Sequence, residues 1–252
     1  MSSNERLTLF SFEIWCSLGD EELSRSKSEN LTYSLKEGGL EVSQKSMKKS
    51  HKFFQALFDQ LFDVCINYIN IENENEEEDT WDISKACNYI LGIIVQLVDS
   101  EKIDKVLNYV INNIDNNENL MLKNSSILIF ASAIDSSHKN KVFELVKIYF
   151  DRIILAMENE NQRIKKSATY LMFKITKVFS KNLGLNSVEN LINKCLILLN
   201  VNNKNSVKIC SIFSNLIKGR GDPTTVKNDS KKINFNFFIF LYFFVNFCEF
   251  FI

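Results

Sequence analysis

The sequence predicts an all-α protein built from repeated pairs of helices. The 252 residues include seven glycines and one proline, which are too few for a protein rich in hairpins and tight turns. Apolar residues recur along most of the chain at the spacing of amphipathic helices. Similar segments also return at a regular interval, which is typical of repeat architectures. A hydrophobic content of 45% is sufficient to fill the core of such a fold.

The apolar spacing predicts a first helix from about Glu5 to Leu18. A polar segment rich in Ser, Lys and Glu follows at about 24–46 and predicts a linker. A second helix is expected from about Met47 to Ile69. The inward face of the first helix should hold Leu7, Phe10, Ile14, Trp15 and Leu18, and that of the second Phe54, Leu57, Phe58, Leu61, Phe62 and Cys65.

Segment 71–80 predicts a solvated acidic loop between two helices. Seven carboxylates lie between Glu72 and Asp82 with no basic residue among them, and Trp81 ends the run. Isolated carboxylates are too costly to bury in a core. Their field attracts cations, and an indole face can hold the stem of Lys or Arg. The combination predicts a binding surface for a basic peptide or protein; the alternative is a Glu/Asn-rich insertion without function.

Three similar segments begin at Lys123, Lys165 and Val207, each 42 residues after the one before. Each follows an Asn-rich turn, and Asn is a favoured residue at the start of a helix. An earlier copy begins near Trp81. A period of about 40 residues with two helices per period predicts a HEAT-type α-solenoid, which is a superhelical stack of antiparallel helix pairs.

Residues 1–220 are therefore expected to form about five HEAT repeats, of which the first is incomplete. The second helix of each pair carries small residues that let neighbouring helices approach closely. Helices are expected near 82–98, 101–114, 118–134, 140–157, 160–180, 186–199 and 203–218. The small residues are Ala86, Ser125, Ser126, Ser167, Ala168 and Cys210.

Residues 221–252 form a Phe-rich tail in which the repeat pattern is lost. One interpretation is a translated non-coding stretch that is not part of the fold. Another is a membrane anchor through residues 234–252, although the apolar run 237–245 is shorter than the roughly 18–20 residues that span a bilayer. A third is a segment that binds a partner or joins the core.

Catalysis has little support in the sequence. The two histidines, His51 and His138, are far apart, and no phosphate loop, nucleophile elbow or metal-ligand spacing is present. The six cysteines have no metal spacing and are expected to be free buried thiols in a reducing compartment. The pI of 6.2 and the lack of a sustained basic stripe predict no nucleic-acid binding. We therefore expect neither an enzyme nor a bound cofactor or metal.

The order of several motifs resembles the importin-β family of nuclear import receptors. The motifs are Phe12-Glu-Ile-Trp15, then Asp20-Glu-Glu22, then the acidic run that ends in Trp81, then Lys85-Ala86. The resemblance covers about residues 4–218 and matches a central portion of the family, so it implies a fragment. The acidic run departs from the family because Asn73 and Asn75 interrupt it.

The resemblance implies binding rather than chemistry, in the cytoplasm, the nucleus and the nuclear pore. The expected partners are the importin-α adaptor or a basic cargo, the Ran GTPase, and FG-repeat nucleoporins. Trp15 is equally compatible with a place in the core. Rival interpretations are a HEAT scaffold outside transport, such as a phosphatase or translation-factor platform, and a tail-anchored membrane protein. The expected contact residues are Glu74, Glu76, Glu77, Glu78, Asp79, Trp81, Trp15, Asp20, Glu21 and Glu22.

Overall fold

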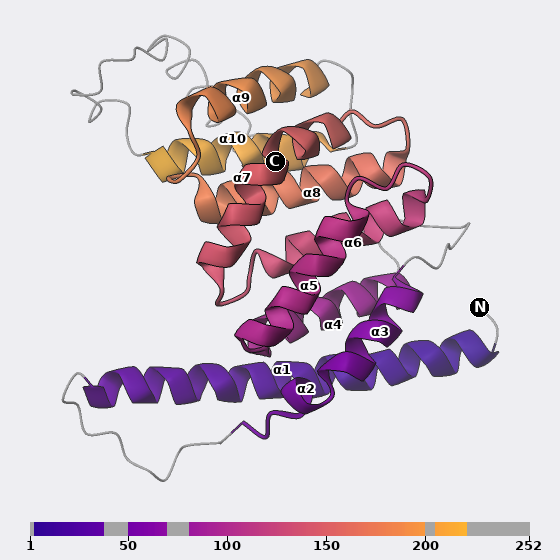
Figure 1. Ribbon diagram of the computed structural model, residues 1–252. Helices are drawn as coiled ribbons and strands as arrows, with labels where there is room; N and C mark the ends of the chain where they lie inside the picture. The colour runs from indigo at the N-terminus through magenta and orange to yellow at the C-terminus, as the bar shows by residue number, and fades with distance from the viewer. Residues whose placement is uncertain (1–2, 38–49, 70–80, 200–204, 221–252) are drawn as a thin grey trace. The chain divides into compact units, whose positions relative to one another are not determined.

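The computed structural model describes residues 3–37, 50–69, 81–199 and 205–220, and all regular structure in these ranges is α-helical (Figure 1). The predicted HEAT-type all-α class is confirmed. Within the same ranges, no helix has both the length and the apolar character needed to cross a bilayer. The helices are α1 (Ser3–Glu37), α2 (Phe53–Ala56), α3 (Phe58–Tyr68), α4 (Ile83–Leu97), α5 (Ser100–Asn113), α6 (Leu120–Ala133), α7 (Lys139–Ala156), α8 (Gln162–Phe179), α9 (Leu185–Leu199) and α10 (Ser206–Arg220).

The chain divides into two compact units. Unit 1 spans Met1–Lys139 and contains α1 to α6, and unit 2 spans Asn140–Ile252 and contains nearly all of α7 and the helices α8 to α10. The predicted tail, residues 221–252, and the five predicted acidic contact residues in 70–80 lie outside the described residues. The predicted division of the chain at residue 220 therefore stays a prediction.

Helix α4 is the centre of unit 1, because α1, α3 and α6 all pack against it. Eight of its 15 residues are buried, including Ile90, Leu91 and Ile94. An amphipathic helix in a two-layer protein buries one stripe, whereas a helix with neighbours on several sides is apolar over most of its surface. Helix α5 packs against α6 in the same way that α3 packs against α4. The second helices of successive pairs, α4 and α6, are thus direct neighbours.

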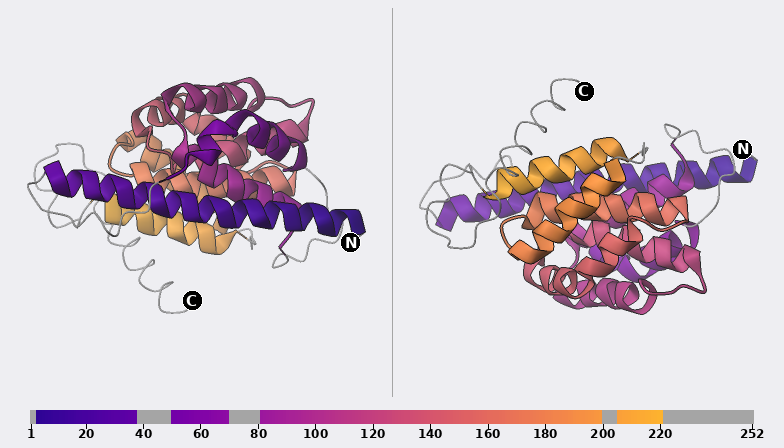
Figure 2. Two further views of the ribbon diagram at one scale, coloured as in Figure 1. Left: turned by 90° about the horizontal axis from the view of Figure 1, so that it is seen from below. Right: turned by 90° about the horizontal axis from the view of Figure 1, so that it is seen from above.

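The first helix is longer than the sequence predicts. It continues without interruption to Glu37, so the predicted end at Leu18 and the predicted linker over 24–37 are wrong (Figure 2). Residues 24–37 contain Arg, Lys, Glu and Leu, which favour helix, and Glu21 pairs with Arg25 one turn later at 2.8 Å. Polar composition alone therefore does not distinguish a solvated helix from a linker.

The inward face of α1 is also different from the predicted one. Leu7 is 65% exposed and Phe10 is 61% exposed, and Ile14 and Leu18 are exposed as well. The face that packs on the rest of unit 1 instead carries Phe12, Cys16, Gly19 and Glu22.

The close approach of α1 to its neighbours explains this choice of face. A Cβ atom at Gly19 would lie 2.8 Å from Ile93 Cδ1 on α4 and 2.9 Å from Phe54 Cζ on α2. Such distances are shorter than packed carbon atoms tolerate. The smallest residue of α1 therefore decides which face packs, although larger apolar residues are present on the other side.

The predicted second helix is two helices, and it begins at Phe53 rather than Met47. A turn at Leu57 separates α2 from α3, so that α2 contacts α1 and α4 while α3 packs along α4. Leu57 is exposed, contrary to the prediction. The other predicted inward residues are buried as expected: Phe54, Phe58, Leu61, Phe62 and Cys65.

Glu22 of α1 caps the start of α2. No side chain caps α2 from its own N-cap position, where Lys52 adopts a left-handed conformation with φ 56°. Glu22 Oε2 instead accepts a hydrogen bond from the Phe54 backbone N–H at 3.3 Å, and its Oε1 accepts one from Ser50 Oγ at 3.2 Å. The side chain is 5% exposed, so these donors replace the water that a buried carboxylate loses.

We predict that Glu22→Ala lowers the free energy of unfolding by about 1–3 kcal/mol, because it leaves buried donors without an acceptor. Urea denaturation of the purified chain measures this change. Glu21→Ala is the matched control, because Glu21 is the adjacent glutamate, is exposed and forms an ion pair with Arg25. The control should stay within about 0.5 kcal/mol of wild type. Equal losses for the two variants would contradict the capping role.

Side-chain caps mark the starts of the later helices, as the Asn-rich turns predict. Asp82 accepts from the Lys85 N–H, Asp99 from Glu101 and Lys102, Asn119 from Met121 and Leu122, and Asn161 from Arg163 and Ile164. The predicted bounds of the helices from α4 to α10 agree with the structure to within three residues. The small residues of the second helices are buried, apart from Cys210, which is partly exposed.

In unit 2, the second helices α8 and α10 pack directly against each other, and α9 packs on α10. Gly219 lies so close to Ser180 that a Cβ atom would meet Ser180 Oγ. Asn215 of α10 donates from Nδ2 to the Phe173 carbonyl and to Thr176 Oγ1, both at 3.4 Å. On α7, the ring of Phe143 lies 4.9 Å from that of Phe179, between ring centroids. The arrangement repeats the contact between α4 and α6.

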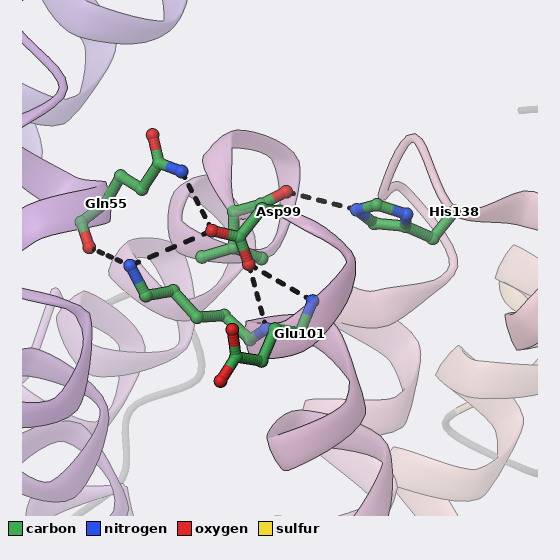
Figure 3. A network of polar contacts seen from close by, with 6 residues as sticks. Gln55, Asp99, Glu101 and His138 are labelled. Atoms are coloured by element: carbon green, nitrogen blue, oxygen red, sulfur yellow. Dashed lines mark hydrogen bonds and ion pairs between the residues drawn. The ribbon is translucent and has the colours of Figure 1, made fainter.

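A polar network in unit 1 joins the end of α2, the turn between α4 and α5, and the turn between α6 and α7 (Figure 3). Gln55 Nε2 donates to Asp99 Oδ2 at 2.9 Å, and Lys102 Nζ donates to the Gln55 carbonyl. His138, in the turn between α6 and α7, contacts the Val98 carbonyl through Nε2 at 3.1 Å. The network fixes the start of α5 to the end of α2 and to the next turn along the stack.

We predict that this network weakens in acid. Backbone hydrogen bonding from Lys102, followed by the Gln55 amide, lowers the pKa of Asp99 below its ordinary value of 3.8. A lowered folded-state pKa stabilises the protein above that ordinary value, and the stabilisation is lost as the pH falls through the folded-state pKa. Wild type should therefore be more stable than Asp99→Asn at pH 7, and urea unfolding should show that the difference shrinks at pH 3. A difference that does not change with pH would contradict this prediction.

Candidate partner-binding face on α1 and α4

The described part of the predicted binding site lies at the start of α4 and in the middle of α1. Trp81 precedes the N-cap of α4, and its side chain is 46% exposed. Asp20 and Glu21 lie on the exposed surface of α1. Asp20, Glu21 and Glu22 lie inside a helix, because α1 continues past the predicted end at Leu18 to Glu37.

Tyr89 of α4 brings Trp81 and Asp20 together. Its ring meets the Trp81 ring edge to face, with centroids 6.2 Å apart and an angle of 73° between the planes. Its hydroxyl donates a hydrogen bond to Asp20 Oδ1 at 2.8 Å. Sequence reasoning missed Tyr89; the available signal was an aromatic residue with a polar end, four residues after Lys85, on the side of α4 that is not buried.

Two hydrogen bonds fix the start of α4, next to Trp81. Ser84 Oγ donates to the Ile69 carbonyl at 2.6 Å, which holds the end of α3 beside the start of α4. Asp82 accepts from the Lys85 N–H at 2.8 Å and is 5% exposed. Asp82 is therefore a buried helix cap and does not belong to the acidic surface in which the sequence analysis counted it.

The other predicted contact residues of α1 differ in environment. Glu21 is exposed and paired with Arg25. Glu22 is buried at the start of α2, so its carboxylate cannot reach a partner that lies over Asp20. Trp15 is partly buried, and its ring meets Phe54 edge to face at 5.8 Å, which agrees with the core alternative. The face that remains consists of Trp81, Tyr89, Asp20 and Glu21, and we call it the α1–α4 face.

The hydrogen bond to Asp20 changes the acidity of Tyr89. It is the largest cause that raises the pKa of the Tyr89 phenol above its ordinary value, with partial burial as the next cause. Ionisation of Tyr89 would remove the donated proton and place two negative charges side by side.

We predict that Asp20→Asn lowers the pKa of Tyr89 towards the ordinary value for tyrosine. Absorbance at 295 nm followed against pH, with the Tyr89→Phe protein subtracted, isolates this phenol from the other tyrosines. Because the pKa is raised, the hydrogen bond is intact at neutral pH and is lost as the pH rises through that pKa. Identical Tyr89 titration curves for wild type and Asp20→Asn would contradict the hydrogen bond between Tyr89 and Asp20.

The described residues do not form a recognisable metal or nucleophile site. Among them, no group of three His, Cys, Asp or Glu side chains is placed to hold a metal ion. The described cysteines are free, and Cys16, Cys65, Cys87 and Cys195 are buried. Burial is the largest cause that raises the pKa of Cys16 to about 11 and that of Cys195 to about 12, so these thiols stay protonated at neutral pH. His51 lies just before α2, whereas His138 lies between α6 and α7.

Comparison with curated proteins agrees with the resemblance that the motifs indicate. Importin subunit beta-1 of Saccharomyces cerevisiae is 19% identical over 224 residues, which cover 88% of this chain and 25% of the relative. Importin subunit beta-1 of Schizosaccharomyces pombe is 22% identical over 145 residues, which cover 58% of this chain and 16% of the relative. The resemblance to importin-β is confirmed. No protein-family model matches the chain, which spans at most about a quarter of the length of these relatives.

Solved structures of importin-β share the fold. A crystal structure of importin-β grown from ammonium sulfate superposes with a TM-score of 0.76 at 20% identity, covering 90% of this chain and 25% of that one. Kap95p bound to RanGDP gives a TM-score of 0.66 at 19% identity, and the Kap95:Nup1 complex gives 0.68 at 19% identity. Each of these two covers 86% of this chain and 24% of the solved chain.

Proposed function

We propose that this importin-β-like chain acts in nuclear transport by binding a basic segment of an import partner on the α1–α4 face. The observation that carries the proposal is the contact of exposed Trp81 with Tyr89, whose hydroxyl is bound to Asp20. It places an indole, a phenol ring and a carboxylate within reach of one cationic side chain. The acidic residues that precede Trp81 in the sequence carry further negative charge.

The face offers a basic side chain two kinds of interaction. Asp20 Oδ1 accepts from Tyr89, so its second oxygen can accept from a guanidinium or ammonium group of the partner. The exposed indole of Trp81 can cover the aliphatic stem of that side chain and attract its charge, an effect of about 0.5–1 kcal/mol at an exposed site. Tyr89 contacts both Asp20 and Trp81, so these two side chains are already positioned before a partner binds.

The choice of partners rests on the importin-β resemblance. The related Kap95p has been solved with RanGDP and with Nup1. We therefore propose Ran and FG-repeat nucleoporins as partners of this chain, and the basic segment of importin-α or a basic cargo as the ligand of the α1–α4 face. Ran and cargo would exclude each other if they favour different curvatures of the helix stack, since two ligands that bias one equilibrium are thermodynamically coupled. The proposed location is the cytoplasm, the nucleus and the nuclear pore.

We predict that Trp81→Ala weakens binding of a fluorescein-labelled, Lys/Arg-rich peptide by about threefold to tenfold, since it removes one cation–π and stem contact. Asp20→Asn should weaken it less and should reduce its salt dependence, because it removes one charge. E76Q/E77Q/E78Q tests the acidic segment in the same assay. Fluorescence anisotropy at two salt concentrations measures all of these effects.

The control removes three carboxylates from helices of unit 2. E144Q/D151N/E189Q lowers the negative charge as much as E76Q/E77Q/E78Q does, at exposed positions on α7 and α9. Binding should stay within about twofold of wild type in this control, because none of the three carboxylates belongs to the α1–α4 face. Equal weakening in both triple variants would indicate a nonspecific charge effect, and unchanged binding in Trp81→Ala would overturn the proposed face.

The membrane-anchor alternative has a separate test. If residues 234–252 anchor the chain, deleting residues 221–252 should move the protein from the membrane fraction to the soluble fraction after cell lysis. Recovery in the same fraction with and without these residues would exclude the anchor.

A further inference from the structure

Helices α8 and α10 of unit 2 carry a charge opposite to that of the α1–α4 face. Helix α8 contains five basic residues and no acidic one, and α10 contains three basic residues and no acidic one. The two helices pack against each other. The described acidic residues of unit 2 lie instead on α7, on α9 and in the turn between α7 and α8: Glu144, Asp151, Glu158, Glu160 and Glu189.

The exposed surface of α8 gathers its cations with two aromatic rings on one stripe. The spacing of three, four and seven residues places these side chains on the same face of a helix, and every other face is mostly buried. Between Lys166 and Lys177 the stripe is about 16 Å long. We call it the α8 stripe, and its members are Arg163, Lys166, Tyr170, Phe173, Lys174 and Lys177.

The aromatic residues take part in the charged surface. Lys174 Nζ lies 5.5 Å from the centroid of the Tyr170 ring. Phe173 is partly exposed, and its carbonyl accepts from Asn215 of α10, so this part of the stripe borders α10. Helix α10 adds Lys208, seven residues before Asn215, and Lys218, three residues after it, on the same side of the helix. The surface therefore combines positive charge with flat apolar faces across two helices.

The basic residues at the start of α8 are not placed where they stabilise the helix itself. Arg163, Lys165 and Lys166 lie in the first turns of α8, where the helix dipole favours negative charge, and no acidic residue is present in the first turn. Arg163 and Lys166, and likewise Lys174 and Lys177, are like charges three residues apart, which repel each other. Helix stability accounts for Lys177, which lies in the last turn of α8, but not for the cations of the first turns. A negatively charged partner is attracted by all of them.

We propose that the α8 stripe is a second interaction surface, which binds an acidic protein segment that also carries apolar side chains. The lysines and Arg163 attract its carboxylates, and Tyr170 and Phe173 pack against its apolar residues. A short acidic segment is favoured over nucleic acid, because the whole chain has a net charge of −1 and so has no overall attraction for a long polyanion. A short segment needs to contact only the stripe.

The test measures binding of a fluorescein-labelled 12-residue peptide of Asp and Glu with two leucines to the full 252-residue chain. K166Q/K174Q/K177Q should weaken binding by about tenfold, as expected for three partly screened charge contacts. The control K141Q/K147Q/R152Q removes three exposed cations of α7 and should weaken it by less than about twofold. The same peptide with Asn and Gln in place of its acidic residues should not bind.

The melting temperature distinguishes a loss of binding from a loss of folding in this test. K166Q/K174Q/K177Q changes side chains outside the buried face of α8, so its melting temperature should stay close to that of wild type. Trp81→Ala should leave acidic-peptide binding unchanged, which separates this surface from the α1–α4 face. Equal weakening by the two triple variants would overturn the proposal. Tighter binding of a single-stranded oligonucleotide of equal charge would overturn it in favour of a nucleic-acid surface.

Discussion

The structure depends on helices that cannot bury their apolar surface alone and must share it with neighbours in the stack. Helix α4 shows this most clearly, because α1, α3 and α6 all pack against it and leave few of its positions for polar residues. Close contact is obtained where side chains are smallest, at Gly19 between α1 and α4 and at Gly219 beside Ser180. A bulky residue at either position would separate helices that the rest of the packing brings together. Each pair is thus stable as part of the stack rather than by itself.

This packing leaves the second helices with one solvent-facing stripe each, and the stripes differ in chemistry. In unit 1, Trp81, Tyr89 and Asp20 combine aromatic rings with negative charge. In unit 2, Tyr170 and Lys174 of the α8 stripe combine an aromatic ring with positive charge. Since the core requires only apolar and small residues on the inner positions, the stripes are unconstrained by folding. One scaffold can therefore present surfaces for oppositely charged partners without changing its architecture.

Much of the helical framework could be predicted because its signals are local. Apolar spacing located the helices from α4 to α10, and Asn161 and Asn119 start helices as their capping chemistry indicates. The candidate site was less predictable because it depends on contacts between distant residues. Tyr89 meets Asp20 across 69 positions of the sequence, and Glu22 reaches the Phe54 N–H across 32. No local pattern shows that one of two adjacent glutamates is exposed and the other caps a helix on another part of the chain.

The incorrect face of α1 has a more specific cause in the nature of solenoid helices. In the pairs of unit 1, a first helix packs on one side of each second helix, as α3 does on α4, while the neighbouring second helix packs on another side. Helix α1 packs against α4 in the way that a neighbouring second helix does. The face that it uses carries Phe12, Cys16 and Gly19. The row Leu7, Phe10, Ile14 and Leu18 lies on a different side and is exposed. Its composition is that of a packing surface, so the spacing rule selected it. The rule detects apolar faces correctly, but a helix in a stack has more than one, and only the tertiary contact at Gly19 shows which of them meets α4.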